Sequence, residues 1–337
     1  MSYWLFPLIT ATSFLLTWLF RLYARKIGLM DTPNQRSSHS QVTARGGGIS
    51  IVLVFIIATL FLAPLENIPS ELIYGLCLGG GVVALIGFID DLRSLSAVIR
   101  IAVHVIASII VLKAIENNIG FSWFDFSNSP NIFFYIISTP AIVWALNLYN
   151  FMDGIDAIAG VETIIITLGI SFIIFINAGY SAYVELLLIL SFSTLGFLIW
   201  NWPPAKIFMG DVSSGFLGFI LSCLAIITSS LGLINIWSWL IICGTFLVDA
   251  TITLLQRMLR GDKIFEAHKS HTYQILSRRY TSHKKVVLGL IIVNICWLFP
   301  FAMIATMKPE YGTIFTFIAL FPLAIFALKT GAGINNT

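Results

Sequence analysis

About eleven runs of roughly twenty apolar residues follow one another along this chain, separated by short polar segments. A helix of about 20 mostly apolar residues is long enough to cross the hydrocarbon core of a bilayer. Lipid offers no hydrogen bonds to the backbone, and the alternating segments of a membrane barrel are absent, so each run is predicted to be a helix. The runs are 3–22, 47–64, 72–89, 97–115, 132–149, 158–178, 182–200, 213–231, 234–256, 286–307 and 311–328.

Composition supports a surface covered by lipid. Only 10% of the 337 residues are charged and 58% are hydrophobic, whereas a soluble domain carries about 25% charged residues. So few charges cannot cover a water-exposed surface, which excludes a soluble globular protein. The predicted fold is an all-α integral membrane protein, with residues 1–337 forming a single polytopic domain in a lipid bilayer. No nucleic-acid partner is expected.

The basic residues predict the orientation of this bundle. All but three of the 19 lysines and arginines lie in or beside the loops that follow odd-numbered runs; the exceptions are Lys113, Lys308 and Lys329. Such an excess is typical of cytoplasmic loops. The N-terminus is therefore predicted outside and the C-terminus in the cytoplasm. No basic residue precedes the first run, unlike in a secretory signal, so that run is predicted to be a permanent span.

The other polar side chains gather in the same loops, after spans 1, 3, 5, 7 and 9. A transporter would be expected to place its polar groups near the middle of the membrane, on broken helices. Polar groups at one interface instead favour chemistry between a water-soluble substrate and a lipid. The clusters are Asp31–His39 with Arg45–Gly48, Gly87–Asp91, Asn147–Asp156, Lys206–Gly215 and His268–Gln274.

Some clusters have a purely structural explanation when they are taken alone. Asp90 and Asp91 could be a solvated helix end beside Arg93. Asp211 could cap the helix that follows it, with Ser213 in the first turn.

The cluster after the fifth span is harder to explain in that way. Asn150, Asp153 and Asp156 recur at every third position, and neighbours three apart share a face in a helix. Carboxylates flanked by strongly apolar sequence are costly to place, and they indicate a functional site.

Together the clusters contain the parts of a phosphoryl-transfer site. Mg²⁺ is usually held by one or two carboxylates and by substrate phosphates. Phosphoryl transfer also needs positively charged clamps and an oriented nucleophile. His268 and His271 lack acidic partners at zinc-site spacing, so contacts to a phosphate or a base are predicted for them instead.

In this order the five clusters resemble the polyprenyl-phosphate N-acetylhexosamine-1-phosphate transferases of the glycosyltransferase family 4 type. That family is related to the phospho-muramoyl-pentapeptide translocase. The motif from His268 to Gln274 is similar to that of its O-antigen initiating branch. The resemblance implies a bacterial inner-membrane enzyme with a cytoplasmic cleft that lipid reaches from the side. It implies transfer of an N-acetylhexosamine-1-phosphate, in this branch also of a 6-deoxy sugar, from a UDP-sugar to undecaprenyl phosphate.

The resemblance also implies roles for single residues. Asp211 is the expected ligand of Mg²⁺, for which Mn²⁺ could substitute. The expected catalytic residues are Asp90, Asp91, Asp153 and Asp156. The expected substrate contacts are Arg45, Asn147, Asn150, Lys206, His268 and His271. The implied partners are undecaprenyl phosphate and a UDP-N-acetylated hexosamine, and the oligomeric state is open between a monomer and a homodimer.

Two other functions compete with this interpretation. A lipid flippase or transporter without chemistry predicts polar residues at mid-membrane, where Asp249 is one of few. A CDP-alcohol phosphotransferase predicts an Asp-x-x-Asp-Gly-x-x-Ala-Arg segment. The Asp153-Gly154-Ile155-Asp156 stretch lacks both the upstream aspartate and the Ala-Arg pair.

Overall fold

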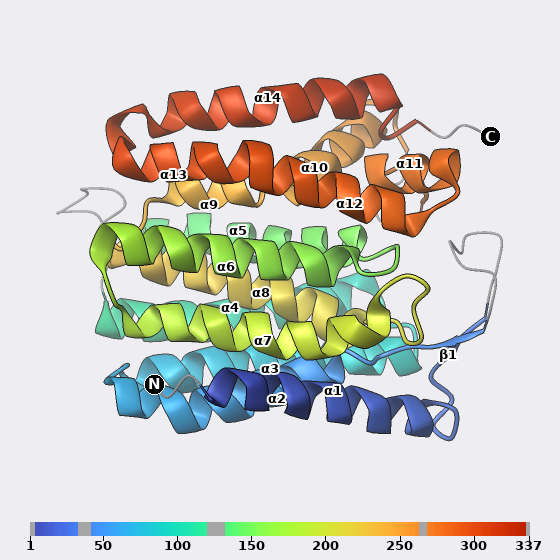
Figure 1. Ribbon diagram of the computed structural model, residues 1–337, viewed down its shortest axis with the longest axis horizontal. Coiled ribbons are helices and arrows are strands. Elements are labelled where there is room, and N and C mark those ends of the chain that lie inside the picture. Colours follow the sequence, from blue (N-terminus) through green and yellow to red (C-terminus); the bar gives the residue numbers. More distant parts are fainter. Residues whose placement is uncertain (1–3, 33–41, 120–131, 263–267, 335–337) are drawn as a thin grey trace.

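The computed structural model describes residues 4–32, 42–119, 132–262 and 268–334, and it shows an all-α bundle (Figure 1). Within these residues, ten helices are long and apolar enough to cross a membrane, and a bent helix pair makes an eleventh candidate span. The prediction of an all-α multi-pass membrane protein with about eleven spans is therefore confirmed. The single-helix spans are α1 (Leu5–Ala24), α3 (Ser70–Leu92), α4 (Ala97–Asn118), α5 (Ile132–Met152), α6 (Ile158–Ala178), α7 (Ala182–Asn201) and α8 (Asp211–Ser230).

The remaining spans are each built from more than one helical segment. The second span is α2 (Ile49–Leu62) continued by η1 (Ala63–Glu66), and the last is η3 (Pro309–Tyr311) with α14 (Gly312–Thr330). The tenth joins α12 (His283–Val293), the π-helical η2 (Asn294–Leu298) and α13 (Phe299–Met307). The bent pair is α9 (Ile236–Ile242) and α10 (Gly244–Leu259).

The bent pair differs from the single straight helix predicted for 234–256. α9 and α10 meet at an angle of 75°. A side chain on Gly244, at the break, would collide with Leu320 and press on Leu298. Just beyond the break, Thr245 donates a hydrogen bond of 2.5 Å to the buried Glu162, whose other oxygen accepts one of 2.7 Å from Asn294. Close packing and this polar network hold the bend in place.

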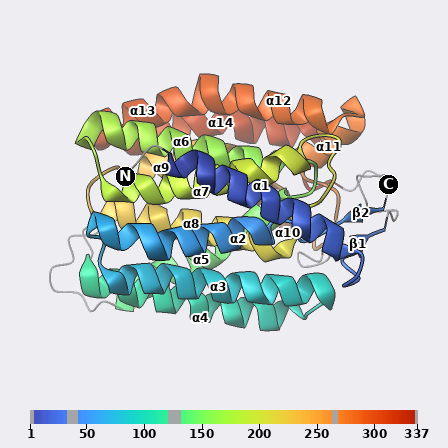
Figure 2. The ribbon, with the colours of Figure 1, turned by 60° about the horizontal axis from the view of Figure 1, so that its bottom comes forward.

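α8 lies at the centre of the bundle, between α3 and α5, and most of its residues are buried (Figures 1 and 2). α1 begins at one end of the bundle and α14 finishes at the other, as an odd number of crossings requires. The helix ends that carry the predicted polar clusters lie at the end where α14 finishes. The short helix α11 (Thr272–Tyr280) lies there too, as do the antiparallel strands β1 (Met30–Asp31) and β2 (Thr43–Ala44).

The clusters predicted in separate loops thus share one end of the molecule. A parallel bridge between Ala44 and Ile207 joins the loop after the first span directly to the loop after the seventh. Part of the first cluster, at residues 33–41 with Arg36 and His39, lies outside the described residues.

Candidate active site

The first turn of α8 is bound by a carboxylate from another helix. The N–H groups of Asp211 and Val212 donate hydrogen bonds of 3.1 Å to the two side-chain oxygens of Asp91, in the last turn of α3. Unpaired N–H groups and the helix dipole make a helix N-terminus favourable for an anion. The Asp91 side chain is fully buried there. Asp91, and not Asp211, therefore caps α8, so the capping role considered for Asp211 is wrong and its carboxylate is available for other contacts.

Two arginines tie the carboxylates together. Arg45 follows β2, and its guanidinium lies 2.8 Å from Asp91 Oδ1 and 2.6 Å from Asp211 Oδ1. Arg100 of α4 lies 2.8 Å from Asp90 Oδ2 and 3.9 Å from Asp211 Oδ2. Asp211 is the point where the two pairs meet. Three carboxylates predicted from two separate motifs are thus in one cluster.

Electrostatics in the cluster favour the charged form of Arg45. Burial alone would lower the pKa of Arg45, but the nearby charges of Asp211, Asp91 and Asp31 raise it above its ordinary value. The Arg45 side chain is half-buried, and a guanidinium that stays charged is suited to holding a phosphate as well as a carboxylate.

A narrow pocket opens below this cluster, between α3, α4, α5 and α8. Asp90, Arg100 and Asp211 line it together with Asn147 and Asn150. Asn150 donates a hydrogen bond of 2.9 Å to Ser214 of α8, which fixes the side chain at the pocket wall. Both predicted asparagines are therefore placed in the same pocket as the carboxylates.

Asp153 and Asp156 do not continue a helical face. α5 ends at Met152, and the chain is not helical from Asp153 to Ala157, where φ is 68°, so neither aspartate lies on a helix face. The expectation that Asn150, Asp153 and Asp156 share a helix face is wrong for this reason.

Asp156 instead holds neighbouring loops together. Its carboxylate accepts the Ala205 N–H at 3.0 Å and lies 3.2 Å from His283 Nδ1 of α12. These contacts connect the loops after the fifth and seventh spans to the start of the tenth span. Asp156 therefore stabilises the loops beside the site.

Asp153 remains close to the cluster. Burial raises the pKa of the Asp153 carboxyl well above its usual range, and the charge of Asp211 acts in the same direction. The carboxylates of these two residues therefore repel one another across the site.

The predicted histidines form a second polar group around Asp249 of α10. Asp249 accepts hydrogen bonds from the N–H groups of Thr272 and Tyr273 at 2.8 and 3.0 Å, and His271 Nδ1 lies 3.6 Å from it. His271 is buried, whereas His268 is half-buried and stacks on the His271 ring. His271 thus helps to anchor α11, and His268 is the more accessible of the two.

Lys206 lies apart from the carboxylates. Its ammonium is exposed and sits 5.3 Å from the centre of the Trp200 ring, which Arg21 also approaches. No described contact joins Lys206 to the carboxylate cluster, so its predicted phosphate contact stays a prediction.

Several residues of the site were not identified from the sequence. Arg100 and His104 both line the pocket, and Asp249 organises the histidines. Asp249 could have been found from the sequence, because a carboxylate inside an apolar run indicates a functional site. Arg100 and His104 lie one turn apart near the start of α4. A basic residue at that position is also expected from the excess of Lys and Arg in cytoplasmic loops, so Arg100 did not indicate a site by itself.

The donor set fits a divalent cation that is shared with substrate. Among the described residues, no three His, Cys, Asp or Glu side chains form a complete metal cage. Mg²⁺ needs only one or two carboxylates when substrate phosphates complete its shell. Four acidic side chains gather around only two guanidiniums, so the cluster has more acidic groups than cations to pair with them.

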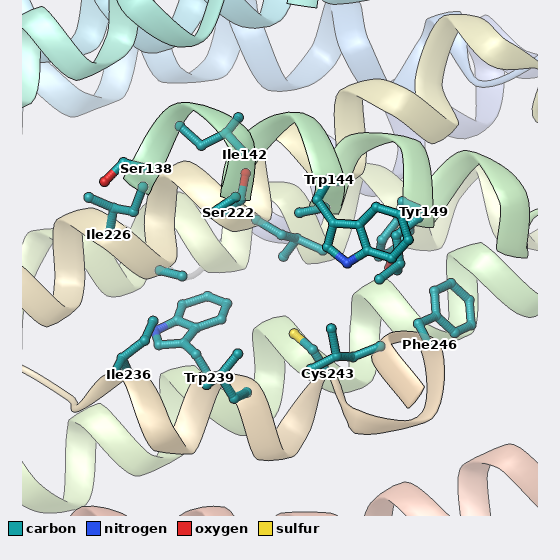
Figure 3. A pocket seen from close by; sticks show the side chains of 18 of the residues that line it. Ser138, Ile142, Trp144, Tyr149, Ser222, Ile226, Ile236, Trp239, Cys243 and Phe246 are labelled. Carbon is teal, nitrogen blue, oxygen red and sulfur yellow. The ribbon is translucent and has the colours of Figure 1, made fainter. Parts of the chain in front are cut away.

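An apolar cavity of about 280 Å³ lies along α5 and α8, two of the helices that also form the polar pocket (Figure 3). It lies between α5, α8, α9 and α10, with Trp144 and Trp239 on opposite sides. Leu146 and Gly215 line the polar pocket, whereas Ala145 and Gly218 of the same two helices line the cavity.

We expect Gly87→Ala to disturb the cluster by separating α3 from α8. A methyl group at Gly87 would collide with the backbone of Asp211. Overpacking of this kind costs about 1–3 kcal/mol. The midpoint of thermal unfolding in detergent should fall, and activity should fall with it.

The matched control is Gly81→Ala in the same helix, where the nearest atom to the added methyl is 3.8 Å away. Alanine is the better helix former, so this variant should be neutral or slightly stabilised. Equal behaviour of the two variants would contradict close contact between α3 and α8.

His268 is expected to make stability depend on pH. Burial, together with the charges of His271 and Arg257, lowers the pKa of His268 to about 4. The unfolded chain binds the proton near the ordinary histidine value, about 6.5, so folding stability is lost as pH falls from there toward 4. His268→Gln should lose less stability than the wild type over that window, measured as thermal midpoints at several pH values. Parallel curves would contradict the assignment.

Known proteins resemble this chain over most of its length. Residues 73–229 match glycosyl transferase family 4. A phospho-N-acetylmuramoyl-pentapeptide-transferase of Fervidobacterium nodosum is 30% identical, over 71% of this chain and 76% of its own. A probable undecaprenyl-phosphate N-acetylglucosaminyl 1-phosphate transferase of Bacillus subtilis is 27% identical, over 95% of this chain and 89% of its own. The undecaprenyl-phosphate alpha-N-acetylglucosaminyl 1-phosphate transferase of Escherichia coli K12 is 26% identical, over 94% and 89%.

Proposed function

Since this chain belongs to glycosyl transferase family 4, we propose that it transfers an N-acetylhexosamine-1-phosphate from a UDP-sugar to undecaprenyl phosphate and releases UMP. The observation that carries the proposal is the presence of two unlike spaces along the same two helices, α5 and α8. A carboxylate–arginine cluster lies at one end of the bundle, and an apolar cavity lies within the membrane-spanning helices. A polar nucleotide sugar would bind at the cluster, and the apolar chain of a lipid phosphate would lie in the cavity.

The apolar cavity suits the start of the polyprenyl chain. Its wall contains four aromatic side chains from three helices, Trp144, Tyr149, Trp239 and Phe246, and little polar surface (Figure 3). Burial of such a chain is favourable in proportion to the apolar area removed from water. With the chain there, the lipid phosphate would lie beside Asn147 and Arg100 of the polar pocket.

The proposed reaction is a direct displacement at phosphorus. An oxygen of the lipid phosphate attacks the β-phosphorus of the UDP-sugar, and the bond from that phosphorus to the bridging oxygen breaks. UMP leaves with that oxygen, and a polyprenyl-diphospho-sugar forms. The bond between sugar and phosphate is not touched, so the anomeric configuration is retained.

The residues of the cluster would have different roles in this reaction. Mg²⁺ held by Asp211, with Asp153 beside it, would neutralise the charge of the diphosphate. Arg45 and Arg100 would offset the remaining phosphate charge, and Asp90 would hold Arg100 in position through their contact of 2.8 Å. Asp91 would position Asp211 by fixing the first turn of α8.

We place this site on the cytoplasmic side of a bacterial inner membrane. The polar end of the bundle carries the loops in which nearly all lysines and arginines lie. UDP-sugars are water-soluble, so their site must face an aqueous compartment.

The function is tested by UMP release from purified protein in detergent with undecaprenyl phosphate and Mg²⁺. UDP-N-acetylglucosamine, UDP-N-acetylgalactosamine and a UDP-linked N-acetylated 6-deoxyhexosamine should be offered separately. We expect release that requires both lipid and Mg²⁺ from at least one donor, which would also name the sugar. Movement of a lipid-linked sugar across vesicles, with no UMP from any donor, would instead establish the flippase alternative.

A further inference from the structure

A second apolar cavity, of about 290 Å³, lies on the opposite face of α10 from the cavity in Figure 3. The walls come mainly from α10, α11, α12 and α14. Thr245 and Val248 of α10 line this cavity, whereas Phe246 and Leu247 line the other, and no lining residue is common to both. The two cavities are therefore separate. The proposed reaction places its acceptor lipid in the first cavity and gives the second no ligand.

The cavity opens at the surface where α11 meets α12. Tyr280, Lys285 and Gly289 belong to its lining, and all three are exposed. A side chain built on Gly289 would meet no atom within 4 Å, so the mouth is open there. From the mouth the walls become apolar, with Leu290, Val293 and Phe326 among them. An open mouth with apolar walls behind it suits an acyl chain that enters from the membrane.

The segment that forms the mouth is basic. The segment 272–293 contains no aspartate or glutamate, and Lys329 of α14 lies one turn beyond Phe326. Arg279, Lys284 and Lys285 have no ion pair among the contacts of the described residues. The basic residues of this segment are Arg278, Arg279, Lys284 and Lys285.

The carboxylates nearby already have partners. Asp249 faces the inner wall and accepts hydrogen bonds from Thr272 and Tyr273. Asp156 is paired with His283, at the start of α12. Neither is left to neutralise the lysines, so the cations at the mouth are available to an anion from outside the protein.

We propose that this cavity binds one acyl chain of an anionic phospholipid, whose phosphate is held by Lys285 at the mouth. The cytoplasmic leaflet of a membrane is rich in anionic lipids and attracts basic side chains beside a span. Basic pockets between helices on that side favour such head groups. The bound lipid would pack against α11, which carries His271 and Tyr273 toward the candidate active site.

The test is competition between two lipids with the same acyl chains, followed by native mass spectrometry of the full-length protein. Protein in detergent receives equal amounts of phosphatidylglycerol and phosphatidylcholine. We expect the wild type to retain phosphatidylglycerol preferentially. Lys285→Gln should lower that preference about fivefold, as expected for the loss of one basic side chain near the lipid surface. Gly289→Trp should prevent retention of both lipids.

Two control variants separate this site from general effects. Leu288→Trp introduces the same indole ring one residue away, at an exposed position outside the cavity. Lys308→Gln removes a charge at the other end of the bundle. Both should retain lipid as the wild type does. Equal retention of the two lipids by the wild type, an unchanged preference in Lys285→Gln, or displacement by undecaprenyl phosphate or by free glycerol phosphate would each overturn the proposal. Because lipid retention is read without turnover, its failure is distinct from failure of the proposed reaction.

Discussion

Replacing Asp211 with asparagine is expected to lower kcat by about 10³-fold, the scale of losing one electrostatic contact to a transition state. The substitution keeps the size of the side chain and removes its charge. The guanidinium of Arg45 would lose its contact of 2.6 Å, and the cluster would lose the carboxylate best placed to hold Mg²⁺. UMP release at saturating substrates, measured over a range of Mg²⁺ concentrations, tests this.

Stability should change little in Asp211→Asn. The N–H groups at the start of α8 are bound by Asp91, so the helix does not depend on the Asp211 carboxylate. A thermal midpoint near that of the wild type, with activity lost, is the expected combination. Lys308→Gln, at the far end of the bundle, is the control and should keep both. An Asp211→Asn enzyme with a tenth or more of wild-type activity would contradict the assignment.

Asp90 and Asp91 are expected to respond differently to the same substitution. The Asp91 side chain is fully buried between Arg45 and two backbone N–H groups. Asparagine brings only one acceptor oxygen for these donors, and breaking such a buried pair costs about 3–5 kcal/mol. The thermal midpoint of Asp91→Asn should therefore fall by roughly 5–10 °C.

Asp90→Asn is the matched comparison. Its partner Arg100 is 35% exposed, so water can replace much of the lost contact, and a surface-type loss of about 1 kcal/mol or less is expected. This variant should instead lose activity, because Asp90 lines the pocket and holds Arg100. Thermal unfolding and UMP release on both variants decide the matter. A wild-type midpoint for Asp91→Asn would show that Asp91 does not secure α8.

Asp90 and Asp91 have different contacts that the sequence does not distinguish. Asp90 and Asp91 are adjacent in sequence, and both were predicted to be catalytic. In the structure, one faces Arg100 and the pocket, and the other caps a helix that begins 120 residues later. The cap could not be predicted, because either carboxylate has the right chemistry and only the packing of α3 on α8 selects between them.

Asp153 and Asp156 show the same limit. Helical spacing predicted a shared face, but α5 ends at Met152, and the carboxylate of Asp156 is bound by Ala205 and lies beside His283. Likewise the bend between α9 and α10 depends on Glu162 and Asn294, which come from other spans.

By itself the sequence determined the number of spans and the gathering of the polar clusters at one end. Lipid and water act on each segment separately. The thickness of the bilayer sets the length of a helix that crosses it, and the charge of a loop sets the side of the membrane on which that loop lies. The tertiary structure alone decided which carboxylate meets which arginine. Arg45 and Asp211 are 166 residues apart, and their contact of 2.6 Å exists only because β2 and the first turn of α8 lie side by side.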